Sequence, residues 1–149
     1  MATFSQRRRR CGFTLLEVLI VITVIAILSM LVIPRAMSAR RRAKEAQLKG
    51  NLTELRECIE LFEATTAAWP PQLADLMVTS GGDISANFDG RGGMVDRMAY
   101  DGPYLVTGDG QLPDDPFTGA ADWVYDNSNG DVRSNSDLTA LNGEAYNTW

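Results

Sequence analysis

The feature that most constrains the fold of this chain is an apolar run over residues 13–33, in which Glu17 is the only ionisable side chain. A helix needs about 20 residues to cross the roughly 30 Å hydrocarbon core of a bilayer. The run is therefore predicted to form a membrane-spanning helix. A carboxylate inside such a span costs about 2.5–3.5 kcal/mol on insertion scales. Glu17 either lies close enough to the interface to be tolerated or is kept to pair with a positive charge.

The start of this run resembles a known processing signal. Residues 12–17 read Gly-Phe-Thr-Leu-Leu-Glu, and they follow a short basic leader with arginines at positions 7–10. The chain is similar here to type IV pilins and type II secretion pseudopilins, and most like the major pseudopilins. The resemblance implies that prepilin peptidase cuts between Gly12 and Phe13 and N-methylates Phe13. It also implies that Glu17 pairs with the amino terminus of a neighbouring subunit during filament assembly, where the two charges offset one another.

The resemblance implies a pilin-like α+β fold, in which a long N-terminal helix, transmembrane in its first half, packs against a small antiparallel β-sheet. We expect a leader at residues 1–12 and a transmembrane, filament-core helix at 13–33. The helix should continue outside the membrane over 34–68, and a small globular α+β domain with a variable loop and a C-terminal β region should follow at 69–149. One helical face is expected to be buried by that domain, because its apolar residues recur with the helical period: Leu48, Leu52, Leu55, Ile59 and Phe62.

Prolines predict where the helix is interrupted. Pro34 removes one backbone hydrogen bond, so we expect a helix break there. In the related pilins such a proline marks loosening within the filament, and a simple bend at the membrane exit is the alternative. Pro70 and Pro71 should end the helix, and a short helical turn is expected at residues 72–77. Further on, short strands are predicted near residues 102–105, 112–117, 123–126 and 131–133, with a hairpin turn at 127–130.

Composition argues against an enzyme. Histidine is absent from all 149 residues, which removes the commonest general base, the usual zinc ligand and any Ser-His or Cys-His pair. The formal net charge is −5, with a leader that carries arginines and no acid, so the rest of the chain is more acidic still and no nucleic acid is expected as a partner. Leader cleavage would separate Cys11 from Cys58, and Cys58 is predicted to be a small buried hydrophobe.

The resemblance further implies a calcium ion in the C-terminal loop. Calcium prefers hard oxygen ligands, and the candidates at close spacing are Asp126, Asp131, Asn135, Ser136 and Asp137. No EF-hand pattern is present, and clusters of Asp, Asn and Ser also form ordinary turns with side-chain caps. The sequence therefore leaves both readings open, and no other cofactor is expected.

Charge beyond the span is uneven. Residues 35–44 are rich in arginine and lysine, and Glu45 is the one acid beside them, so charge bias alone does not fix the orientation in the membrane. Acids at positions 54, 57, 60 and 63 form either a solvated face or a partner for the basic stretch of another subunit. In the last eight residues, Tyr146 and Trp149 are candidates to dock the tail on the sheet.

The resemblance places the chain in a bacterial inner membrane as a single-pass protein with its C-terminal domain in the periplasm. The expected partners are further copies in a helical homopolymer, minor pseudopilins, prepilin peptidase, the inner-membrane assembly platform and membrane lipid. The expected function is that of a structural subunit whose periplasmic filament drives protein export. A type IV pilus subunit for adhesion, motility or DNA uptake is the first alternative. A signal-anchored periplasmic binding domain or enzyme, never cut at Gly12, is the second.

Overall fold

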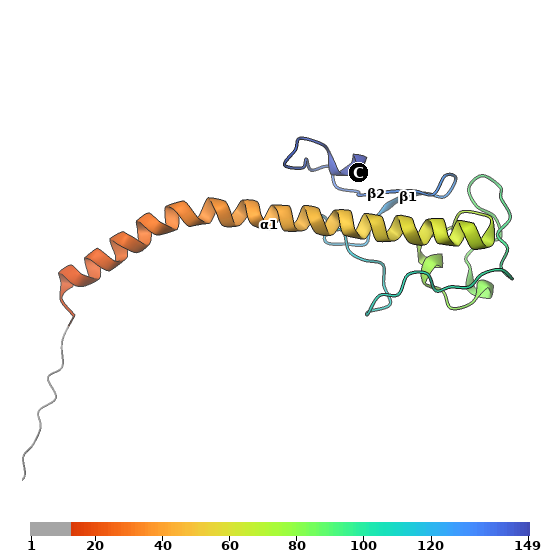
Figure 1. The fold of residues 1–149 in the computed structure, drawn as a ribbon, viewed down its shortest axis with the longest axis horizontal. Helices are drawn as coiled ribbons and strands as arrows, with labels where there is room; N and C mark the ends of the chain where they lie inside the picture. The colour runs from red at the N-terminus through yellow and green to blue at the C-terminus, as the bar shows by residue number, and fades with distance from the viewer. Residues whose placement is uncertain (1–12) are drawn as a thin grey trace, which may run out of the picture. The chain divides into compact units, whose positions relative to one another are not determined.

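The structure is a computed structural model that describes residues 13–149. The leader, with Gly12, therefore lies outside the described residues. The long helix α1 (Leu15–Thr66) comes first, followed by the 3-10 helices η1 (Leu73–Met77) and η2 (Gly81–Asp83), the strands β1 (Val124–Asp126) and β2 (Asp131–Arg133), and the 3-10 helix η3 (Tyr146–Thr148) (Figure 1). The chain divides into two compact units at Arg40. A long helix with a small antiparallel sheet confirms the predicted α+β class.

Helix α1 is continuous through position 34, so the structure contains no helix break at Pro34. A proline removes one of the hydrogen bonds of a helix, and the turns on either side can carry the helix past it. Loosening at this position inside a filament stays a prediction.

The C-terminal end of α1 lies just before the predicted stop. The helix ends at Thr66, and Ala67 takes a left-handed conformation with φ 60°. The Ala67 amide donates to the Glu63 carbonyl at 2.8 Å, which satisfies one of the carbonyls left open at a helix end. Pro70 and Pro71 follow and prevent the helix from resuming.

The core of the second unit is built on one face of α1. The five apolar residues predicted to be buried, from Leu48 to Phe62, are each at most 2% exposed. Phe62 meets the rings of Tyr100 and Tyr104 edge to face, at centroid distances of 5.8 and 5.9 Å, a favoured aromatic geometry. Cys58 is buried as a free thiol that donates to the Tyr104 carbonyl at 3.2 Å, which confirms its prediction as a small buried residue.

The sheet is smaller than predicted. β1 and β2 form a two-stranded antiparallel hairpin in which Tyr125 pairs with Val132. The prediction of strands near residues 102–105 and 112–117 is wrong, since both segments are irregular loops. Prolines remove backbone donors from these loops, and their remaining groups bond elsewhere. The Leu105 amide donates to the Leu76 carbonyl at 3.0 Å, and the Asn51 side chain donates to the Asp114 carbonyl at 2.9 Å.

The hairpin is fixed to the segment that follows α1. The Tyr125 hydroxyl donates to the Pro70 carbonyl at 2.7 Å. Gly130 closes the turn with φ 75°, and a Cβ built on it would lie 2.5 Å from the Trp69 ring. Only glycine meets both conditions without strain, so the turn residue and Trp69 set the position of the hairpin together.

Candidate functional site

The first candidate site is the apolar part of α1. Every large apolar side chain described between Phe13 and Ile33 is 49–84% exposed. A helix that is apolar on all sides is normally buried in a larger apolar environment. Among the described residues α1 is the one helix long and apolar enough to cross a membrane, a property that secretory signals share. The segment is therefore of the kind that lipid or the apolar surfaces of other protein chains cover.

Polar side chains within this segment are satisfied by their own helix. The Thr23 hydroxyl donates to the Leu19 carbonyl at 2.7 Å, and the Ser29 hydroxyl donates to the Ile25 carbonyl at 2.8 Å. Such back-bonding leaves no hydroxyl in need of a partner from outside. The segment thus presents an almost purely apolar surface.

Glu17 is the exception in this surface. It lies in the first turn of α1, where the Thr14 hydroxyl caps the helix by accepting from the Glu17 amide at 3.2 Å. Within residues 13–149 no hydrogen bond or ion pair engages its carboxylate. Phe13 precedes the helix and is 79% exposed. The structure therefore leaves the predicted assembly residue accessible, one turn from the residue that cleavage would make the new amino terminus.

The predicted calcium ligands are divided between two places. Asp126 and Asp131 face each other at the end of the hairpin. The Asp126 carboxylate accepts from the amide and hydroxyl of Ser128 at 2.9 and 2.6 Å, and Asp131 pairs with Arg133 at 3.0 Å. Both acids thus already have partners in the turn.

The other three candidates follow β2. Asn135 and Asp137 line one shallow cavity, and Asn135 donates to the Asp122 carboxylate at 3.0 Å. Ser136 is 5% exposed. The described residues hold no group of three or more His, Cys, Asp or Glu side chains that could bind a metal. Calcium takes 6–8 oxygen ligands, so the five residues as a set do not fit one calcium site, and calcium binding stays a prediction.

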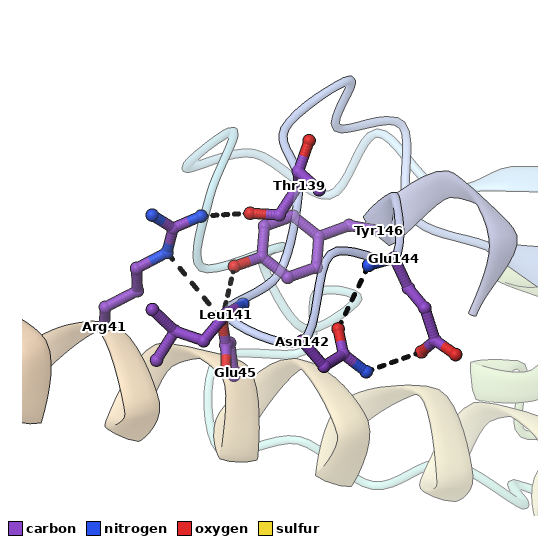
Figure 2. A network of polar contacts seen from close by, with 7 residues as sticks. All are labelled: Arg41, Glu45, Thr139, Leu141, Asn142, Glu144 and Tyr146. Atoms are coloured by element: carbon purple, nitrogen blue, oxygen red, sulfur yellow. Dashed lines mark hydrogen bonds and ion pairs between the residues drawn. The ribbon is translucent and has the colours of Figure 1, made fainter.

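A second cluster was not predicted from the sequence. Arg41 and Glu45, one helical turn apart on α1, bond to the segment 139–146 near the C-terminus (Figure 2). One oxygen of Glu45, Oε1, accepts from the Leu141 amide at 2.9 Å and from the Tyr146 hydroxyl at 2.8 Å. The Arg41 guanidinium donates to the Thr139 carbonyl. The sequence signal was the lone acid beside a basic stretch, but nothing local identifies its partners.

The electrostatics of Glu45 follow from these contacts. Its side chain is 16% exposed, and desolvation by burial raises its pKa. The hydrogen bonds from Leu141 and Tyr146 act in the opposite direction. Together with the positive charges of Arg41 and Lys49, they leave the pKa of Glu45 lowered from its ordinary value. The carboxylate is therefore held in its charged form.

Comparisons with known proteins agree with these features. The family model of the prokaryotic N-terminal methylation motif matches residues 7–33. The type II secretion system core protein G of Aeromonas hydrophila is 30% identical over 115 residues, which cover 72% of this chain and 79% of that protein. Its namesake from Pseudomonas aeruginosa is 34% identical over 65 residues, or 44% of this chain and 46% of that protein.

A pilus protein also matches, over about half of the chain. The type IV wide pilus major component PilA4 of Thermus thermophilus is 34% identical over 70 residues, which cover 47% of this chain and 53% of that protein. No solved structure matches the chain significantly.

The methylation motif, the exposed apolar helix and the small lobe on its continuation define a pilin-like protein of the N-terminal methylation class. Within this class, the chain belongs to the family of type II secretion system core protein G, the major pseudopilins. Members of this family are structural subunits and not enzymes. The predicted resemblance and the predicted absence of an enzymatic role are confirmed by this membership.

Proposed function

We propose that this chain is the subunit of a periplasmic filament that drives protein export in a type II secretion system. The observation that carries the proposal is the apolar helix over residues 13–33, exposed on all sides, with Glu17 as its one charge. Membership of the core protein G family supports the same function. Before assembly lipid would cover this helix, and after assembly the helices of other copies would cover it.

The maturation step is part of the proposal. Prepilin peptidase would cut between Gly12 and Phe13 and N-methylate Phe13. The match of the methylation motif to residues 7–33 supports this step because it spans the cut. Cleavage creates a positive charge at Phe13, four residues before Glu17. In an apolar filament core each charge is costly alone, so pairing the amino terminus of one subunit with Glu17 of the next fixes their register.

The location and the partners are proposals of the same kind. The chain would cross the bacterial inner membrane once, with its C-terminal domain in the periplasm. It would meet prepilin peptidase, the inner-membrane assembly platform, minor pseudopilins and further copies of itself. Glu54, Glu57 and Glu60 are exposed and form no ion pair within residues 13–149, which supports their pairing with the basic stretch of a neighbouring copy.

The experiment that tests this function is intact mass measurement and N-terminal sequencing of the membrane-extracted protein, from cells with and without prepilin peptidase. We expect an N-methylated Phe13 start only when the peptidase is present. A mature protein that still begins at Met1 would contradict the proposal and favour a signal-anchored periplasmic domain.

A second candidate is a type IV pilus subunit, which the match to the Thermus thermophilus pilus component favours over the part of the chain that it covers. Deletion separates the two. Loss of exoprotein secretion supports the secretion filament, whereas loss of surface filaments with secretion intact supports the pilus.

A further inference from the structure

Residues 138–149, directly after the predicted calcium ligands, form a loop with an anchor that the sequence did not reveal. We propose that this loop is held on α1 by a side-chain clasp made of Arg41, Glu45 and Tyr146, and that it does not depend on a calcium ion.

The clasp converges on a single carboxylate oxygen. Glu45 Oε1 accepts from the Leu141 amide and from the Tyr146 hydroxyl, at 2.9 and 2.8 Å. Arg41 Nε lies 3.7 Å from the same oxygen, and another nitrogen of Arg41 donates to the Thr139 carbonyl (Figure 2). These bonds join residues 96 to 101 positions apart in the chain. Hydrogen bonds to a charged group are stronger than neutral ones, so the clasp holds both sides of the loop.

The loop closes on itself between these anchors. The Ala140 amide donates to the Glu144 carbonyl at 2.7 Å, and the Tyr146 amide donates to the Leu138 carbonyl at 3.0 Å. The Asn142 side chain donates to the Glu144 carboxylate at 2.7 Å. These bonds close the loop on itself, and the clasp attaches it to the helix.

Aromatic side chains of the loop make further contacts that hold it in place. Tyr146 is fully buried and stacks on Phe117 at a centroid distance of 4.1 Å. Lys49 lies 4.3 Å above the Trp149 ring, a cation–π contact. Arg41, Glu45 and Lys49 are spaced four residues apart, so they lie along one stripe of α1. η3 also contacts β2, which means that the tail docks on the helix as well as on the sheet.

The donors around this loop do not suit a metal. The groups that face Glu45 Oε1 are an amide, a hydroxyl and a guanidinium, all of which are positive toward it, and a cation would have to displace them. Glu144 is the only acid within the loop, and it is bonded to Asn142. Calcium needs 6–8 oxygen ligands, whereas the predicted ligands lie in two places, and Asp126, Asp131 and Asn135 already bond to other side chains.

The test uses the full chain purified in detergent. Thermal unfolding and limited proteolysis of the C-terminal loop are measured in calcium chloride and in EGTA. The variants are Tyr146→Phe, which removes only the hydroxyl, Glu45→Ala, and the double variant. Glu54→Ala is the control, because it removes an exposed acid from the same helix. Asp137→Asn tests the best placed of the predicted calcium ligands.

We expect Tyr146→Phe and Glu45→Ala each to lower the melting temperature by about 2–8 °C and to raise the rate of cleavage in the loop several-fold. The melting temperature of the double variant should fall by less than the sum of the two single effects, because both substitutions remove the same Tyr146–Glu45 hydrogen bond. EGTA, Asp137→Asn and Glu54→Ala should leave the melting temperature and the cleavage pattern unchanged.

Two results would overturn the proposal. One is a drop in melting temperature on adding EGTA, reversed by calcium. The other is a clasp variant that melts and is cleaved like the wild type. Both measurements are made on dispersed subunits, so their outcome is independent of whether the chain forms a secretion filament or a pilus.

Discussion

The two units of this chain differ in whether their apolar side chains are exposed or buried. Between Phe13 and Ile33 the large apolar side chains remain exposed and the polar ones bond to their own helix. Beyond Arg40 one apolar face of α1, from Leu48 to Phe62, is buried by segments with little regular structure. The apolar side chains of the first unit therefore need lipid or other chains to cover them, whereas the apolar face in the second unit is covered by the chain itself. Substitutions in the two should accordingly produce different kinds of failure.

The largest expected effect is on assembly. Glu17→Gln removes the one charge from the apolar segment while keeping its size, so filament formation and secretion should be lost. Cleavage and folding of the second unit should be unchanged, because no described residue bonds to the carboxylate. Electron microscopy of filaments and an exoprotein secretion assay measure the loss. Thr23→Val is the matched control in the same segment. Normal assembly of the Glu17→Gln variant would contradict an assembly role for Glu17.

Next in size is loss of the buried core in the second unit. Phe62 is fully buried against two tyrosines, so Phe62→Ala should destabilise that unit by about 3–5 kcal/mol. Denaturant unfolding of the detergent-solubilised protein measures it. The neighbouring Leu61 is 51% exposed, and Leu61→Ala should change stability by less than about 0.5 kcal/mol. Equal losses in the two variants would mean that this face of α1 is not the buried one.

A smaller effect is expected in the hairpin turn. Gly130→Ala would place a methyl group in a left-handed position and against the Trp69 ring, so we expect a loss of about 1–2 kcal/mol or more from the backbone conformation alone. Gly108 has open space around it and no positive φ, which makes Gly108→Ala the control. The free energy of unfolding of both variants is the measurement, and a neutral Gly130→Ala would show that the turn adjusts freely.

The smallest effect is a pH dependence in the clasp. Because the folded state lowers the pKa of Glu45 from its ordinary 4.5, the clasp stabilises the protein fully above pH 4.5. This contribution is lost as the pH falls through the lower folded value. Melting temperatures across this acid range should fall more steeply for the wild type than for Glu45→Ala. Parallel curves would mean that the Glu45 carboxylate contributes no stability.

The same contrast explains how much the sequence could predict. The apolar run, the cleavage motif and the buried stripe from Leu48 to Phe62 are local patterns, and the structure contains the helix and the stripe as predicted. The hairpin could be predicted because its turn residues also form a local pattern. The strands near residues 102–105 and 112–117 were wrong, because prolines and bonds to distant groups decide those segments. The clasp was missed for a similar reason, since Glu45 and Tyr146 are 101 positions apart.

The hydroxyls of Thr23 and Ser29, turned back onto their own helix, have a mechanical consequence for the proposed filament. A surface that offers no directional bonds holds its neighbours by contact area alone, and contact area changes little when one helix slides or rotates against the next. Within the apolar core, the ion pair at Glu17 would then be the one directional contact that sets the position of a subunit against its neighbour. A filament core built in this way would be compliant, and it would twist and extend under load without breaking hydrogen bonds between its helices.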